Sequence, residues 1–108
     1  MEFLGGIRRF FKESSLSVAV QSGNNVKARE LATKMGFHSQ RVKDIEVLAL
    51  LQAFDFNLIH GHKEYAAYDQ ELARGLVGSE RLDLLNRTRS ILPYGSVTIK
   101  HGSYTPRR

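Results

Sequence analysis

Cysteine is absent from the 108 residues. This absence excludes a disulfide framework, a thiolate zinc site, an iron–sulfur cluster and a cysteine nucleophile. Proline occurs only as Pro93 and Pro106, so the first 92 residues contain no proline break. No apolar run approaches the roughly 18 residues that a membrane-spanning helix needs, and the N-terminus lacks a signal-peptide pattern. We therefore expect a cytoplasmic protein with no membrane partner.

The composition is 42% hydrophobic and 25% charged, which is typical of a globular domain. Sixteen Lys and Arg residues against eleven Asp and Glu residues give a formal net charge of +5. The charge is unevenly spread, because residues 55–80 carry five acidic and two basic side chains, whereas residues 81–108 carry one acidic and six basic ones. A basic excess of this kind permits an anionic partner such as a nucleic acid.

Apolar periodicity predicts a mostly α-helical domain of about five helices over residues 1–104, followed by a basic tail at 105–108. Asp55 to His62 is expected to be a loop, and Ser79 is expected to cap the last helix, which carries Leu82, Leu85 and Leu92. The four earlier helices are predicted at residues 2–13, 26–35, 40–54 and 63–77.

A small two-stranded β element is also predicted. Residues 16–20 and 97–100 both alternate in the manner of strands. If these strands pair, the basic ends of the chain come together. Turn chemistry follows the first strand at residues 22–25, where Asn24 or Asn25 can cap the next helix.

Residues 28–47 read ARELATKMGFHSQRVKDIEV and resemble the helix-turn-helix of DNA-binding regulators. Ala32 is the small residue where the second helix crosses closely, and Gly36 supplies a left-handed turn. The order of elements before and through this stretch loosely resembles the start of a winged-helix domain. The core positions of the motif are Leu31, Met35, Val42 and Ile45.

The resemblance implies that the exposed start of the second helix contacts DNA. Gln and Arg can each make two hydrogen bonds to one base, and Ser can contact a base or a phosphate. Against this, Asp44 and Glu46 in the same helix would repel phosphates. The predicted contacts are His38, Ser39, Gln40, Arg41 and Lys43 at the second helix, and Lys27, Arg29 and Lys34 on the first. Arg8, Arg9, Arg87, Arg89, Arg107 and Arg108 are predicted secondary basic contacts.

The sequence thus predicts a small, sequence-specific DNA-binding protein that acts in transcription regulation or DNA maintenance. The helix at 40–54 is apolar on nearly every side over residues 47–51, which suggests burial in the core or in a homodimer interface. Two alternatives stay open. The motif can be a plain αα-hairpin in a non-enzymatic adaptor or structural oligomer that binds protein. The late arginines can instead serve an RNA-binding protein.

Other constellations are weaker. His60, His62 and Glu64 could approach a metal ion, but nothing in their spacing completes a ligand set. Tyr65 and Tyr68 lie on the apolar stripe of their helix and are expected to pack, while Asp69, Glu71 and Asp83 are expected to face solvent. No nucleophile elbow or phosphate-binding loop is present. We therefore expect no enzyme activity, no metal and no cofactor.

Overall fold

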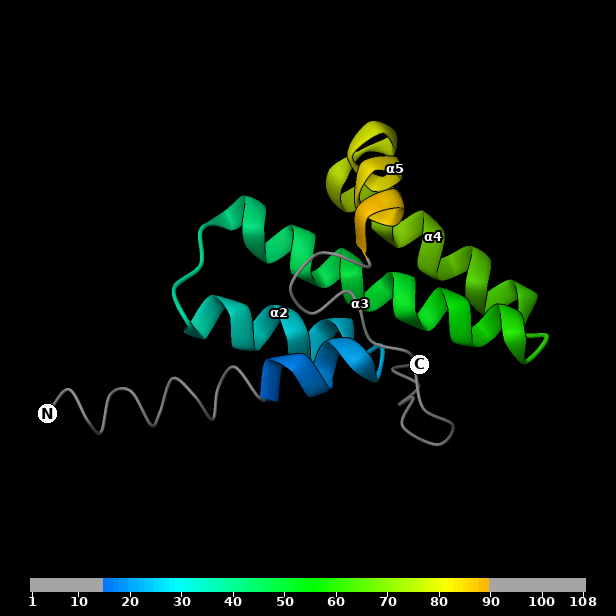
Figure 1. Cartoon of the computed structure of the whole chain (residues 1–108), viewed down its shortest axis with the longest axis horizontal. Coiled ribbons are helices and arrows are strands. Elements are labelled where there is room, and N and C mark those ends of the chain that lie inside the picture. Colours follow the sequence, from blue (N-terminus) through cyan, green and yellow to red (C-terminus); the bar gives the residue numbers. More distant parts are fainter. Residues whose placement is uncertain (1–14, 90–108) are drawn as a thin grey trace, which may run out of the picture.

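The computed structural model describes residues 15–89, and almost all of them are helical (Figure 1). Residues 15–21 form a helical segment, and no strand occurs anywhere in the described range. The prediction of a mostly α-helical protein is confirmed. The remaining helices are α2 (Asn25–Lys34), α3 (Ser39–Ile59), α4 (Lys63–Val77) and α5 (Ser79–Thr88). None of these helices is long and apolar enough to cross a membrane.

Helix α3 is the central element of the fold. Every residue from Ile45 to Ala53 is buried, because neighbours cover opposite sides of the helix. One side packs against residues 15–21 and α2, and the other packs against α4 and α5. The two sides follow helical spacing with an offset of two residues, which is about 200° around the axis. The first side carries Ile45, Leu48 and Ala49, and the second carries Val47, Leu50 and Leu51.

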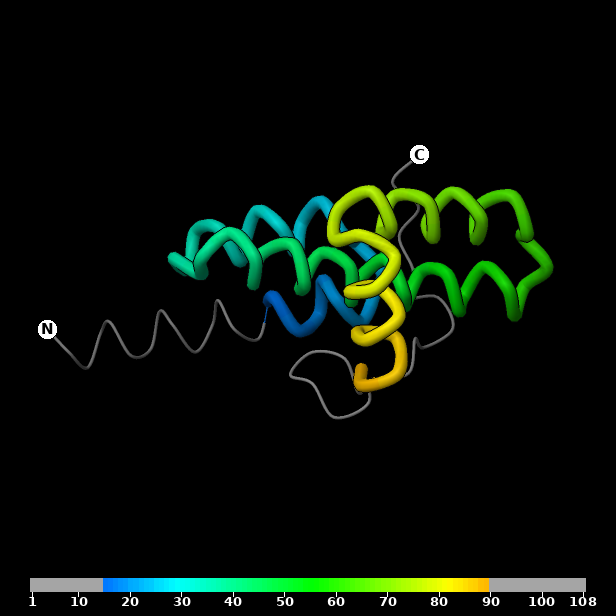
Figure 2. Tube along the Cα trace, turned by 90° about the horizontal axis from the view of Figure 1, so that it is seen from above, coloured from blue at the N-terminus to red at the C-terminus, as the bar shows by residue number. Residues whose placement is uncertain are grey.

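Figures 1 and 2 show how the other helices are arranged on α3. Helix α2 lies alongside the first half of α3 and runs in nearly the opposite direction. Helix α4 returns along the second half of α3, and α5 crosses over the middle. The two halves of α3 therefore have different neighbours, and its two ends point away from each other.

The predicted strand at residues 16–20 is wrong, because these residues are helical. Leu16, Ala19 and Val20 are buried together, whereas Val18 is 62% exposed. A strand would place Leu16, Val18 and Val20 on one face, but a helix places Leu16, Ala19 and Val20 there. The short alternating pattern fits both periods, and packing against α3 selects the helix. The predicted pairing strand at 97–100 and the helix at 2–13 lie outside the described residues.

The turns on either side of α2 agree with the prediction from the sequence. Asn24, one of the two predicted caps, caps α2, with its side-chain oxygen accepting from the Lys27 backbone N–H at 3.1 Å. Gly36 has φ +85° and ends the following turn in the left-handed region, also as predicted. Gly23 has φ +72° and lies so close to α3 that an added Cβ would be 3.0 Å from Ala53 Cβ. The first turn is therefore pressed against the central helix.

Two helix boundaries differ from the prediction. Helix α3 continues to Ile59 through most of the expected loop, because no glycine or proline interrupts it before Gly61. Asn57 stabilises this last stretch by donating from Nδ2 to Asp69 Oδ2 of α4 at 2.8 Å. Helix α4 has the predicted bounds, and the N-cap of α5 is Gly78 rather than Ser79.

The inward face of α4 is also not the predicted one. Ala66, Asp69 and Ala73 are buried, whereas Tyr65 and Tyr68 are 47% and 50% exposed. Small residues face α3 because the two helices lie close together, and the tyrosines are displaced to the rim. Asp69 was expected at the surface, but it is fully buried and hydrogen-bonded.

Candidate nucleic-acid interface

The turn between α2 and α3 and the first turn of α3 form the polar end of the central helix. His38, Ser39, Gln40 and Arg41 are all exposed there. The first turn of α3 contains no acidic residue, so the partial positive charge of the helix N-terminus is not neutralised within that turn. We call residues 34–43, which include Lys34 and Lys43, the basic end.

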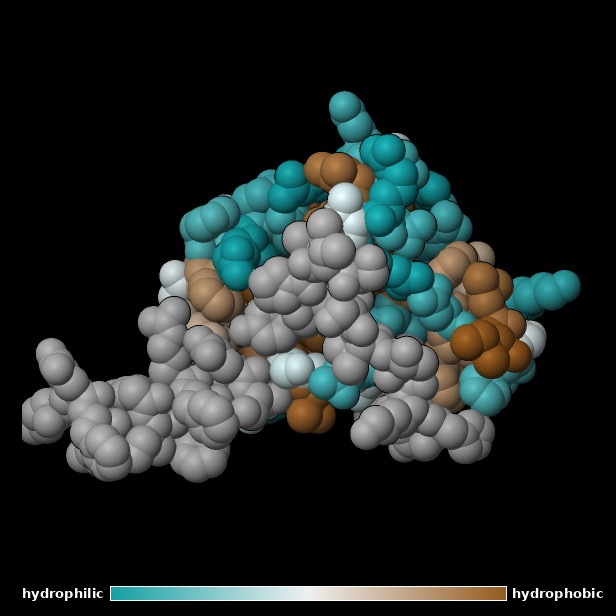
Figure 3. Space-filling model, in the orientation of Figure 1, coloured by the Kyte–Doolittle hydropathy of each residue, from teal (hydrophilic) through white to brown (hydrophobic). Residues whose placement is uncertain are grey.

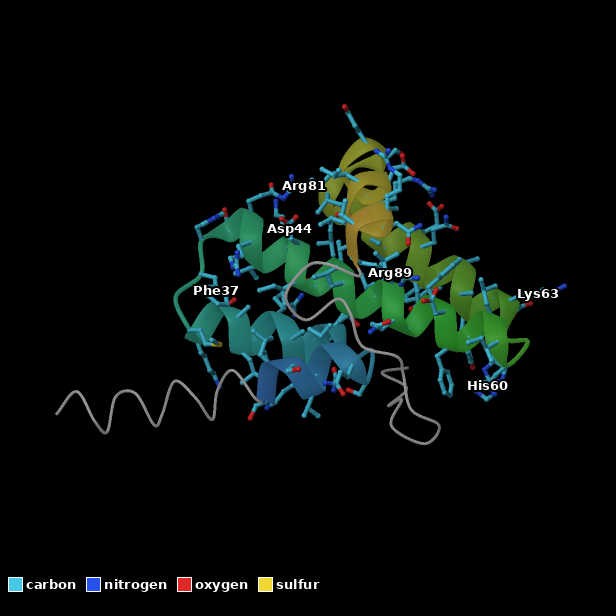
Figure 4. All side chains as sticks on the ribbon, viewed as in Figure 1. Phe37, Asp44, His60, Lys63, Arg81 and Arg89 are labelled. Carbon is cyan, nitrogen blue, oxygen red and sulfur yellow. The ribbon has the colours of Figure 1, made fainter. Side chains whose placement is uncertain are left out.

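Arg41 is oriented by an aromatic ring. Its guanidinium carbon lies 5.0 Å from the centre of the Phe37 ring, within the range of a cation–π contact. Phe37 is itself partly buried against the core that residues 15–21, α2 and α3 form. The ring of Phe37, which is labelled in Figure 4, thus supports one side of the guanidinium. The Arg41 side chain stays exposed.

His38 provides the N-cap of α3. The backbone N–H of Arg41 donates to His38 Nδ1 at 3.4 Å, which is a long hydrogen bond. Ser39 becomes the first helical residue, and its side chain stays exposed. An imidazole can replace a hydroxyl as the cap because its ring nitrogen reaches the same N–H group.

Asp44, which was expected to repel phosphates, is held by a neighbouring helix. Arg81 of α5 donates from Nε to Asp44 Oδ1 at 3.2 Å and from Nη2 to Oδ2 at 2.5 Å (Figure 4). Gln40 also donates to Asp44 Oδ1, at 2.9 Å. The hydrogen bond and the charge of Asp44 raise the pKa of Arg81, so the arginine stays protonated and the carboxylate is compensated.

The cations of the described range divide into two groups. Arg29, Arg74, Arg81, Arg87 and Arg89 each form an ion pair. Within residues 15–89, the basic side chains without an ion pair are Lys27, Lys34, Arg41, Lys43 and Lys63. Four of these five lie on α2 or at the start of α3, and only Lys63 lies elsewhere. Glu30 of α2 is the exposed carboxylate nearest in sequence to this group.

The structure separates some of the predicted contacts from the basic end. Lys27 lies in the first turn of α2, at the far end of that helix from the turn. Arg29 lies 3.6 Å from the buried carboxylate of Glu46, which also accepts from Asn25 Nδ2 at 3.2 Å. Glu46 therefore does not face solvent. It joins α2 to α3.

The secondary contacts do not gather at the basic end either. Arg87 is paired with Asp83 at 3.5 Å within α5, and Arg89 reaches Asp55 Oδ2 of α3 at 2.5 Å. Each of these arginines has a carboxylate neighbour away from the start of α3. Arg8, Arg9, Arg107 and Arg108 lie outside the described residues.

Two contacts at this end were not predicted from the sequence, that of Phe37 with Arg41 and that of Asp44 with Arg81. Phe37 and Arg41 are four residues apart, a spacing that brings side chains together once a helix begins nearby. That signal was available in the sequence. The pairing of Asp44 with Arg81 joins residues 37 positions apart, and no local pattern indicates it.

The core of the resembled motif is present, but its geometry is that of a hairpin. Ala32 and Ile45 are buried, and Leu31, Met35 and Val42 pack partly against them. The resemblance implies a steep crossing of roughly 90–120° between the two helices. Figures 1 and 2 show α2 and α3 side by side in nearly opposite directions, as in an αα-hairpin.

The possible metal ligands near the other end of α3 do not form a centre. The ring centres of His60 and His62 are 6.4 Å apart. Among residues 15–89, no group of three or more His, Asp or Glu side chains is placed to hold a metal ion.

Comparisons with protein-family models, with curated proteins and with solved structures find no match to this chain. The chemistry of the basic end is therefore the basis on which its function can be inferred. A fold of this simplicity is compatible with many functions, so specific side chains carry more weight than the helical architecture.

Proposed function

We propose that the protein binds double-stranded DNA through the basic end. The observation that carries the proposal is that three of the five cations without an ion pair in the described range, Lys34, Arg41 and Lys43, lie in this end. Such cations can exchange their counterions for phosphates, which is the main source of affinity for DNA. Each paired arginine in the described range already has a carboxylate close to it.

The first turn of α3 can also supply base recognition. Gln40 and Arg41 are of the types that make paired hydrogen bonds to adenine and guanine. The N-terminal turn of a helix is the part that reaches base edges when a helix enters the major groove. Phe37 supports Arg41 from one side, which reduces the entropy lost on binding. Lys34 and Lys43 would then contact the backbone.

The local sequence resembles that of regulators, so we further propose a role in transcription regulation or DNA maintenance. This finer proposal rests on the helix-turn-helix resemblance of residues 28–47. DNA contact by the start of α3 does not depend on it, because the exposed side chains are the same in a hairpin. Arg81 supports either version by compensating Asp44 beside the contact residues.

The test is fluorescence anisotropy of the full chain with a labelled random duplex at about 50 and 200 mM salt. Arg41→Ala and Lys34→Ala are compared with Arg74→Ala, which removes the same charge from α4. Arg41→Ala should cost about 1–3 kcal/mol of binding at a selected site and relax base choice at one position. Lys34→Ala should weaken all sequences equally and lower the salt slope by about one. Arg74→Ala should bind like the parent.

Equal losses from all three variants would show that only the overall charge matters, and no loss from Arg41→Ala would remove α3 as the contact element. Unlabelled RNA serves as a competitor. If RNA competes as well as or better than DNA, the proposal shifts to an RNA-binding protein. No binding at the lower salt concentration would leave the α2–α3 hairpin as a structural element.

A further inference from the structure

The end of α3 opposite the basic end exposes apolar side chains. Leu58 is 50% exposed, Ile59 is 78% exposed and Tyr65 is 47% exposed, although the chain buries smaller residues elsewhere. Figure 3 shows hydrophobic surface over the region where α3 meets α4, and Figure 4 places His60 and Lys63 there. We call Leu58, Ile59 and Tyr65, with the turn at residues 60–62, the apolar end.

The apolar end is held in place by local contacts. The ring of Phe56 lies 4.3 Å from that of His60, and the ring of His62 lies 5.9 Å from that of Tyr65 in an edge-on arrangement. The backbone N–H of His62 donates to the Asn57 carbonyl at 2.7 Å, and Gly61 takes φ +76° to close the turn. An ordered apolar surface loses little entropy on association, so it is suited to binding.

The middle of α3 cannot provide a subunit interface. The sequence suggested residues 47–51 for either the core or such an interface, and all five are buried within the chain itself. Any association surface therefore lies elsewhere. Leu58 and Ile59 lie in the last turn of the same helix, and their side chains reach solvent.

We propose that the apolar end binds a second copy of this chain about a twofold axis. Lys63 and Glu64 are adjacent and exposed at its edge, and neither forms an ion pair in the described range. A twofold axis that passes between these two side chains would bring each Lys63 opposite Glu64 of the other copy, so the edge can be complementary to itself. The basic end lies at the opposite end of α3, a helix of 21 residues and about 31 Å, so it stays outside this interface.

The test measures the oligomeric state of the full chain by sedimentation over a wide range of protein concentration. The parent should dimerise as concentration rises, and Ile59→Asp should remain a monomer. Lys63→Glu makes the edge wholly acidic and Glu64→Lys makes it wholly basic, so each alone should weaken the dimer about tenfold or more. Mixing these two variants should restore a one-to-one dimer, as should combining both changes in one chain.

Circular dichroism checks that the variants fold, which is expected because all three positions are exposed. A parent that stays monomeric at every concentration overturns the proposal. So does a dimer that survives Ile59→Asp, or charge variants that fail to associate on mixing. Binding to anionic vesicles that is lost in Ile59→Asp, without dimerisation, would identify a lipid surface as the occupant instead. DNA affinity of the monomeric variants reports separately on the basic end.

Discussion

The two ends of α3 belong to one helix but expose different chemistry. At the start, Arg41 and Lys43 stand in solvent and no acid occupies the first turn. At the finish, Leu58 and Ile59 stand in solvent instead. Helix α2 packs along the first half of α3 and α4 along the second (Figure 1), so the side chains left exposed at the two ends differ. A single buried helix thus presents two separate surfaces.

The largest effect is expected from the buried middle that joins the two ends. Leu50→Ala removes a fully buried side chain from between α3, α4 and α5, and it should cost about 2–5 kcal/mol of unfolding free energy. Leu58→Ala makes the same change at the apolar end, where the side chain is half exposed, and should cost less than about 1 kcal/mol. Urea denaturation measures both. Equal costs would show that α3 is not the core of the fold.

Much of this middle could be predicted from the sequence. The apolar run at 47–51 indicates a helix covered on more than one face, and it is covered so. Hydrophobic periodicity predicted the wrong secondary structure or the wrong buried face where a segment is short or packs closely. Residues 16–20 fit two periods, and the inward face of α4 is made of Ala66 and Ala73 because the helices approach closely. Tyr65 carried the stronger apolar signal but lies at the rim.

The basic end was also predictable only in part. Exposure of Gln40 and Arg41 follows from the motif pattern, and both are exposed. The ion pairs that remove Arg29 and Arg89 from the set of unpaired cations depend on tertiary packing. Their partners, Glu46 and Asp55, are 17 and 34 positions away, and no local spacing connects them.

The next largest effect is a difference in stability between substitutions in the two turns that flank α2. Gly23→Ala introduces a side chain with φ +72° and 3.0 Å from Ala53 Cβ, so strain and overlap add, and we expect a loss of about 2 kcal/mol or more. Gly36→Ala has the same backbone strain but open space around it, so about 1 kcal/mol is expected. Thermal or urea unfolding gives the order. If Gly36→Ala is the more damaging change, the close approach of the first turn to α3 is wrong.

A smaller effect concerns DNA affinity and the charge of Asp44. Arg81→Gln leaves that carboxylate uncompensated next to Gln40 and Arg41, and should lower DNA affinity about three- to tenfold at low salt. Arg89→Gln is a matched control, because it breaks an ion pair of the same 2.5 Å length with Asp55, away from the basic end. Anisotropy titrations compare the two. Similar losses would mean that net charge, and not the state of Asp44, sets the affinity.

The smallest expected effect tests which residue begins α3. His38→Ala removes the ring nitrogen that accepts from the Arg41 N–H, and because that bond is 3.4 Å long the loss should be about 0.5 kcal/mol. Ser39→Ala should be neutral or slightly stabilising, since Ser39 is the first helical residue and alanine favours a helix. Urea unfolding of both variants side by side can resolve this order. A larger loss from Ser39→Ala would identify Ser39 as the cap. The first turn of α3 would then be rotated from its position in this structure, and the basic end would present different side chains to DNA.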